Sequence, residues 1–262
     1  MGYPESVIPV HDVNPLRRVP VVTYALIAAN VVVFLLMPSA AHSLVGNTTA
    51  AQLCDLQSFF ERWGAVPREL IGGHLPALVP TGQAALTRSG AACVLGPPDY
   101  TKSPVLSVLT AMFVHSSWSH LLGNMLFLAV FGNNVEDRMG RGWYVLFYFV
   151  CGYAAGYGFA LLDPSSGGPL VGASGAIAGV LGAYLVLYPR ARVWGLIPFL
   201  FFIPLRVPAW LMLGSWFVLQ GLYATGYGTA SAGDVAYPAH LVGFVVGALL
   251  ALPLRPRAMA RR

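Results

Sequence analysis

A serine and a histidine lie in two separate apolar segments of this chain. Ser174 follows Gly172 and Ala173 where one segment begins, and His240 lies inside a later one. Ionisable and polar groups at membrane depth raise the free energy of insertion, so they are rare there and commonly serve a function. A histidine that takes the proton of a serine hydroxyl turns that hydroxyl into a nucleophile. The pair therefore indicates nucleophilic catalysis, provided that the two segments bring the side chains together.

The composition places these segments in a membrane. Of the 262 residues, 56% are hydrophobic and only 10% are charged, which is too few charges to cover a soluble globule. An uncharged stretch of about 20 residues crosses the hydrocarbon core as a helix, which satisfies its own backbone groups. Six such stretches are found, at 19–37, about 110–135, 142–162, 170–188, 208–227 and 237–254. We therefore predict an all-α membrane protein, a bundle of six transmembrane helices.

Basic residues predict the orientation of the bundle, because they accumulate in cytoplasmic loops. With the N-terminus inside, the inner segments carry 11 of the 15 Lys and Arg residues, and the two short outer loops carry none. We expect a cytoplasmic arm (1–18), a membrane domain (19–254) with an external loop (39–103), and a basic cytoplasmic tail (255–262). The lack of a transit peptide and of a seventh span favours a bacterial plasma membrane. This asymmetry explains the net charge of +5, so nothing favours nucleic-acid binding.

The external loop contains two of the three cysteines, Cys54 and Cys93, whereas Cys151 lies in the third apolar segment. Because the outer side is oxidising, a disulfide between Cys54 and Cys93 is expected, with two free thiols as the alternative. The aromatic first half of the loop predicts a partly helical interfacial element. Its second half, rich in Gly and Pro, predicts irregular structure.

Four polar side chains are expected at a similar depth. With a rise of about 1.5 Å per residue, Ser174 and His240 both lie within about 10 Å of the outer surface. His120 and Asn124 are four residues apart, so they share one face of the second segment at a comparable level. Proton transfer requires the serine oxygen and a histidine nitrogen within about 2.6–3.2 Å. The fourth and sixth segments must therefore pack unusually closely.

Glycines permit such packing. Gly175, Gly179 and Gly182 form a stripe on the fourth segment, and Gly243 and Gly247 share a stripe of the sixth segment with the histidine. Such stripes let membrane helices approach each other and commonly serve packing alone. Here they adjoin the serine and the histidine that would react.

These residues suggest a division of roles. His240 would take the proton of Ser174 and return it to the leaving amine, while Asn124 and the Ser174 backbone N–H, with His120 nearby, would hold the oxyanion. No segment carries a carboxylate to orient the histidine, so we expect a Ser-His dyad. A zinc peptidase would need His-Glu-x-x-His, but His115 and His120 are five apart with no Glu between them, so no metal is expected. His115 receives a supporting role.

Several motifs occur in order along these segments. They are His120 to Phe127, Phe131-Gly132, Glu136 before Gly140, Gly172-Ala173-Ser174-Gly175, Trp216 with Gln220, and Ala239 to Gly243 with Gly247. In these motifs, from about Thr110 to Gly247, the chain resembles the rhomboid intramembrane serine proteases.

The resemblance implies a six-helix bundle without a cofactor, in which the fifth helix acts as a lateral gate. It also implies catalytic Ser174 and His240 with an oxyanion site at His120 and Asn124. Two departures from the family pattern stand out. Leu106 and Ser107 occupy the place of a Trp-Arg pair, and Ala178 replaces an aromatic residue that supports the histidine ring. Tyrosines near the fifth and sixth segments are candidates to replace that support.

A peptide bond inside a stable helix is shielded from a nucleophile, so a membrane substrate must unwind near its outer end. We therefore expect cleavage of single-span membrane proteins near the outer face of the lipid bilayer, through an acyl-enzyme. A rhomboid-like protein that binds clients without cutting them is one alternative, although this chain retains both reactive residues. A small transporter that uses the histidines as a relay is another, but neither broken spans nor inverted repeats are evident.

Overall fold

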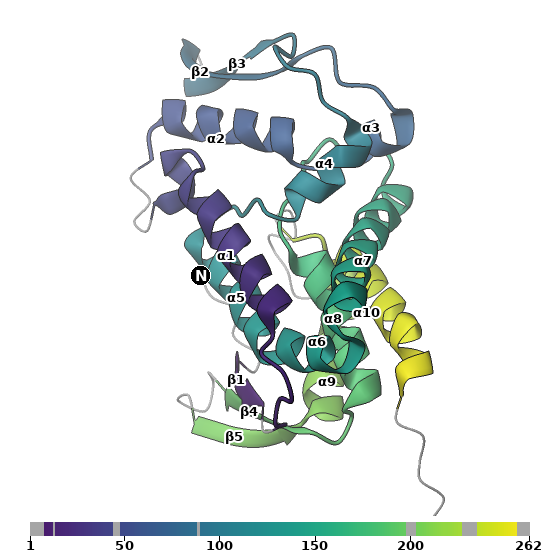
Figure 1. Ribbon diagram of the computed structural model, residues 1–262. Coiled ribbons are helices and arrows are strands. Elements are labelled where there is room, and N and C mark those ends of the chain that lie inside the picture. The colour runs from purple at the N-terminus through teal and green to yellow at the C-terminus, as the bar shows by residue number, and fades with distance from the viewer. Residues whose placement is uncertain are drawn as a thin grey trace, which may run out of the picture. The chain divides into compact units, whose positions relative to one another are not determined.

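The computed structural model describes residues 8–12, 14–43, 48–87, 90–197, 203–226 and 235–255 (Figure 1). The first seven residues of the expected arm and residues 256–262 of the basic tail lie outside these ranges. The chain divides into two compact units. Unit 1 comprises Met1–Ala25, Met125–Ala155 and Gly175–Arg262, and unit 2 comprises Leu26–Asn124 and Gly156–Ser174.

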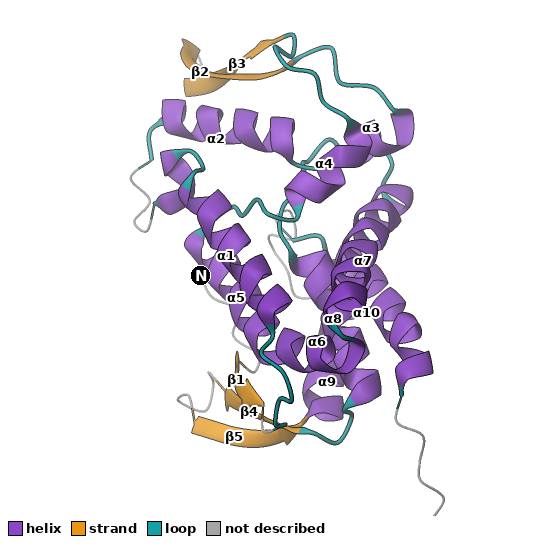
Figure 2. Cartoon of the chain, viewed as in Figure 1, coloured by secondary structure: helices purple, strands orange, loops and turns teal. Residues whose placement is uncertain are grey.

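Helices make up most of the described chain, as the sequence predicts (Figure 2). They are α1 (Val21–Leu35), η1 (Ser39–His42), α2 (Ala50–Trp63), α3 (Pro67–Gly72), α4 (Pro104–Ala111), α5 (Trp118–Phe127), the π-helical η2 (Leu128–Gly132), α6 (Asn133–Met139), α7 (Arg141–Leu162), α8 (Ser174–Leu187), α9 (Ala209–Ala224), α10 (Tyr237–Ala251) and η5 (Leu252–Leu254).

Two described helices, Arg141–Leu162 and Tyr237–Leu254, are long and apolar enough to cross a membrane. Val21–Leu35, Ser174–Leu187 and Ala209–Ala224 are apolar but shorter, so helix length by itself does not reach the predicted six spans.

The predicted bounds of two segments need correction. The segment at 110–135 is not one helix, because α4 ends at Ala111 and α5 begins at Trp118. The segment at 170–188 becomes helical only at Ser174, because Leu170 forms a β-bridge with Ala65 and Gly172 adopts a φ of 116°.

Five strands within the described residues correct the prediction of an all-α fold. β1 (Ile8–Asp12), β4 (Arg192–Ile197) and β5 (Ile203–Pro208) form an antiparallel sheet in the order β1-β4-β5. β2 (Val79–Thr87) and β3 (Gly90–Gly96) form an antiparallel hairpin. β1 lies in the arm, where no regular element was predicted. Its proline, Pro9, opposes a helix but is compatible with an edge strand.

The sheet of unit 1 is attached to the helices by a buried carboxylate. Asp12, at the end of β1, is 4% exposed. It accepts hydrogen bonds from the hydroxyl of Tyr184 on α8 and from Asn134 Nδ2 on α6, the latter at 2.7 Å. A buried carboxylate needs such donors to offset its desolvation. Asp12 therefore links the arm to two helices.

Within unit 1, α8 and α10 approach each other at glycines. A Cβ atom built on Gly243 would lie 2.1 Å from the carbonyl oxygen of Gly175, and one on Gly247 would lie 2.0 Å from that of Gly179. No side chain fits in such a space, so only glycine allows the two backbones to pack this closely. The close approach predicted from the two glycine stripes is present.

The predicted external loop is a small folded element of unit 2. A capping box of Thr49 and Gln52 begins α2, and the hairpin β2–β3 packs against this helix (Figure 1). The irregular structure predicted for its second half is wrong where β2 and β3 form, whereas residues 73–78 and 97–103 contain no helix or strand. Some of the glycines and prolines that suggested it lie at a register shift between Pro80 and Ala84. Gly82 has a φ of 82° there, as a glycine in a β-bulge can.

Two cross-links hold this element together. The Cys54–Cys93 disulfide joins α2 to β3. Lys102 forms a 2.7 Å ion pair with Glu69, both side chains being nearly inaccessible, and donates to the carbonyl oxygen of Glu61 at 2.7 Å. Burial, with the nearby Glu69 carboxylate, raises the pKa of Glu61, although Lys102 opposes the shift.

The glycine contact between α8 and α10 predicts a selective sensitivity to a methyl group. Gly247→Ala should lower the free energy of unfolding by at least about 1–3 kcal/mol, the usual cost of overpacking. Gly214→Ala on α9 is the matched control, because nothing lies within 4 Å of a Cβ built there. Thermal unfolding in detergent measures both. Equal midpoints for the two variants would contradict the packing.

The disulfide predicts a redox-dependent stability. Replacing Cys54 and Cys93 by alanine opens a cross-link across a sequence separation of 39, which should cost about 2–4 kcal/mol. Resistance of the loop to limited proteolysis should fall in the double variant and, to the same extent, in the reduced wild type. Unaltered resistance in both would show that the hairpin does not depend on the bond.

Candidate functional site

Unit 2 contains a cluster of three predicted site residues. His115 is fully buried, and its Nε2 accepts a hydrogen bond from Asn124 Nδ2 at 3.0 Å. An amide nitrogen only donates, so this imidazole nitrogen carries no proton. The rings of His115 and His120 meet edge to face with centroids 5.0 Å apart. His115 therefore holds the Asn124 amide and packs against the ring of His120.

The backbone just before Ser174 passes directly over this cluster. A Cβ atom built on Gly172 would lie 2.7 Å from His120 Nε2 and 3.6 Å from Asn124 Nδ2. The φ of 116° at Gly172 also disfavours any other residue. Gly172 thus has two physical reasons to be glycine. The backbone at Gly172 therefore lies against His120 and Asn124, the two predicted oxyanion residues.

The loop predicted to be external pairs with the segment that leads to this motif. The backbone groups of Ala65 and Leu170 exchange two hydrogen bonds, of 3.0 and 2.8 Å. The Arg68 N–H donates to the carbonyl oxygen of Ser166 at 3.1 Å. A Cβ on Gly64 would lie 2.9 Å from the side chain of Pro169. Backbone pairing of this kind ties the loop to the segment before Ser174.

Ser174 itself is the first residue of α8. The next residue, Gly175, begins the glycine contact with α10 in unit 1. The nucleophile candidate therefore lies where an irregular segment becomes a helix.

His240 lies in the first turns of α10 in unit 1, beside α9. Its Nδ1 is 2.7 Å from Gln220 Oε1, and Gln220 is 8% exposed. The ring of Trp216 lies 6.0 Å from the imidazole with an interplanar angle of 31°. Tyr237 meets the imidazole edge to face at 6.4 Å. Neighbours on α9 and α10 therefore surround the ring.

The sequence gives Gln220 as part of a motif but not as a site residue. The available signal was a buried amide in an otherwise apolar segment, which requires a hydrogen-bond partner. The support expected from a tyrosine is present at Tyr237. Ala178, where an aromatic residue was noted as absent, is buried on α8.

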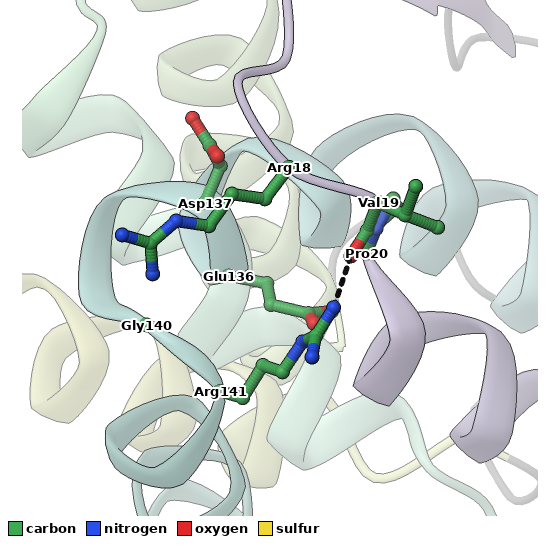
Figure 3. A pocket seen from close by; sticks show the side chains of 7 residues that line it. All are labelled: Arg18, Val19, Pro20, Glu136, Asp137, Gly140 and Arg141. Carbon is green, nitrogen blue, oxygen red and sulfur yellow. Dashed lines mark hydrogen bonds between the residues drawn. The ribbon is translucent and has the colours of Figure 1, made fainter.

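A separate shallow cleft in unit 1 adjoins the start of α1 (Figure 3). Its lining residues are Arg18, Val19, Pro20, Glu136, Asp137, Gly140 and Arg141. Glu136 accepts hydrogen bonds from the N–H groups of Val22 and Thr23, at 3.0 and 2.8 Å, and so caps the positive end of the helix. As this lining includes no serine, cysteine or histidine, we assign the cleft a structural role.

Known proteins are similar to the part of the chain that contains these motifs. The model of the rhomboid domain matches residues 102–257. Rhomboid-like protein 11, chloroplastic, from Arabidopsis thaliana is 34% identical over 152 residues, which cover 54% of this chain and 50% of that protein. Rhomboid protein 1, mitochondrial, from Saccharomyces cerevisiae is 32% identical over 157 residues, which cover 58% of this chain and 42% of that protein.

The match to the domain model covers more than half of the chain, which therefore belongs to the rhomboid family, a family of integral membrane proteins. The chain spans about half, or less, of the length of these relatives. Their names place them in chloroplasts and mitochondria, which does not fit the expected bacterial plasma membrane.

The contact of Gly172 with the histidine pair predicts a local loss of order on substitution. Gly172→Ala should push the segment away from His120 and weaken its pairing with Ala65, so tryptic cleavage after Arg68 should accelerate roughly tenfold or more. Gly168→Ala is the matched control, since the nearest atom to a Cβ there is 3.9 Å away. Equally slow cleavage in both variants would show that the contact does not order the segment.

Proposed function

We propose that this protein is an intramembrane serine endopeptidase that cleaves single-span membrane proteins near the outer membrane face. Ser174 is the nucleophile and His240 is the general base. The proposal rests above all on the 2.1 Å separation between a Cβ built on Gly243 and the Gly175 oxygen. Ser174 directly precedes Gly175, and His240 lies one helical turn before Gly243. Close packing of α8 on α10 thus supports contact between hydroxyl and imidazole.

The proposed reaction proceeds through an acyl-enzyme. His240 Nε2 takes the proton as Ser174 Oγ attacks the scissile carbonyl carbon, and the carbonyl oxygen becomes an oxyanion. The Asn124 side chain, the Ser174 N–H and His120 stabilise that charge. The C–N bond then breaks, and the amine leaves with the proton from His240. Water, activated by the same imidazole, hydrolyses the ester and restores the serine.

The hydrogen bond from Asn124 to His115 supports the oxyanion role. It uses one of the two N–H groups of the amide and leaves the other to donate to an oxyanion. Because the orientation is fixed before the reaction, no reorganisation is needed when charge develops. His115 is thus a positioning residue in this proposal.

The membrane orientation is part of the proposal. The Cys54–Cys93 disulfide supports an oxidising compartment for the loop that contains α2 and β2–β3. The active serine, whose preceding segment pairs with this loop through Ala65 and Leu170, then opens toward the same side. The arm and the basic tail face the cytoplasm.

A serine-reactive fluorophosphonate tests the function. It should label the detergent-solubilised protein, and Ser174→Ala should abolish labelling and lower cleavage of a model single-span substrate by at least about a thousandfold. Ser215→Ala is the matched control, because this serine in α9 donates to the Met212 carbonyl of its own helix. It should leave both signals unchanged.

Labelling that persists in Ser174→Ala would show that another residue is the nucleophile. A wild-type protein that retains a co-expressed substrate without labelling or cutting it would instead establish the non-cleaving client-binding alternative.

A further inference from the structure

The ring nitrogen Nδ1 of His240 contacts the side-chain amide of Gln220 on α9. Gln220 Oε1 lies 2.7 Å from His240 Nδ1, and Gln220 is buried where α9 packs against α10. The contact belongs wholly to unit 1. A buried amide held this close to a ring nitrogen constrains both the direction in which the imidazole points and the nitrogen that carries its proton.

The chemistry of the two groups determines that proton's place. A carbonyl oxygen accepts only, so the opposing Nδ1 must carry the hydrogen. A neutral imidazole has one N–H, which leaves the lone pair on Nε2. This is the tautomer that a base for Ser174 requires. A reversed amide would donate to Nδ1, place the hydrogen on Nε2 and remove the base.

The helices that pack around the ring in the described part of the chain carry no charged side chain near it in sequence. α8, α9 and α10 contain no Asp, Glu, Lys or Arg. Besides His240, the titratable side chains on these three helices are Tyr184, Tyr223 and Tyr237, and α7 carries Arg141, Tyr144, Tyr148, Cys151, Tyr153 and Tyr157. Trp216 and Tyr237 pack against the ring and limit its rotation. The oxygen of the neutral Gln220 amide lies at hydrogen-bond distance from Nδ1, so it is placed to orient the tautomer.

We propose that Gln220 is a positioning residue that fixes His240 in the Nδ1–H tautomer and so replaces the carboxylate of a catalytic triad. The role rests on the proposed function of Ser174 and His240. Because the amide carries no charge, it orients the ring without the strong stabilisation of the imidazolium that a carboxylate gives. It also avoids the desolvation of a buried charge at membrane depth.

Two substitutions separate orientation from packing. Gln220→Leu keeps the volume but removes the acceptor, and should lower kcat by roughly tenfold to a hundredfold with little change in KM. Gln220→Glu restores an acceptor and should retain activity. The acidic limb of its pH–rate profile should move up by about one unit or more, since a carboxylate stabilises the imidazolium. A packing role would give no such shift. Ser215→Ala should leave the profile unchanged.

Nitrogen-15 NMR of the histidines reads the tautomer without activity. The His240 signals, identified by their loss in His240→Ala, should show a protonated Nδ1 and an unprotonated Nε2 in the wild type, and a tautomer mixture in Gln220→Leu. A protonated Nε2 in the wild type would overturn the proposal.

The outcomes distinguish the two proposals. If the wild type is labelled at Ser174 and cleaves substrate, but Gln220→Leu keeps its kcat and tautomer, the positioning role fails while the proposed function stands. If Ser174 is not labelled in the wild type, the proposed function fails and the positioning role fails with it.

Discussion

The contact of α8 with α10 through glycines is the constraint on which the proposed chemistry depends. In lipid, no hydrophobic effect drives two apolar helices together, so they associate through close backbone packing. The oxygens of Gly175 and Gly179 occupy the space that side chains at Gly243 and Gly247 would need. His240 lies about one helical turn before Gly243, and Ser174 directly precedes Gly175. In the proposed mechanism, this packing decides which two side chains can react with each other.

Among the described residues, neutral groups contact His240 and Asn124, the proposed catalytic and oxyanion residues. Gln220 contacts His240, and His115 contacts Asn124. The buried carboxylates of Asp12 and Glu136 instead accept hydrogen bonds near the helix ends. Desolvation explains this division, because a charge within apolar surroundings is costly unless it is paired, whereas an amide needs only one or two hydrogen bonds.

The sequence predicted the features that follow from the composition of a whole segment or from the small size of glycine. Two predicted apolar segments correspond closely to the helices α7 and α10, and the glycine stripes mark the close approach of α8 to α10. The disulfide between Cys54 and Cys93 was also expected, on the basis of compartment. These inferences succeed because an apolar segment in lipid can satisfy its backbone groups only as a helix. A stripe of glycines, in turn, lets a second helix approach closely.

Other features depend on tertiary partners that one sequence does not display. β1 forms because β4 offers an edge, and α8 begins late because Leu170 pairs with Ala65. The hairpin β2–β3 contains residues typical of loops, and its packing on α2 overrides that preference. Gln220 was visible only as an amide in an apolar segment, and its partner 20 residues away appears only when α9 packs on α10.

Cross-linking of the two reactive positions tests the central claim most directly. In a Cys151→Ala background, Ser174→Cys and His240→Cys are combined and treated with dibromobimane, a short reagent that bridges neighbouring thiols. The account predicts a bridged peptide by mass spectrometry. A control that pairs Ser174→Cys with Leu249→Cys, an exposed position farther along α10, should give none. Only singly alkylated cysteines in the first variant would contradict the pairing of Ser174 with His240.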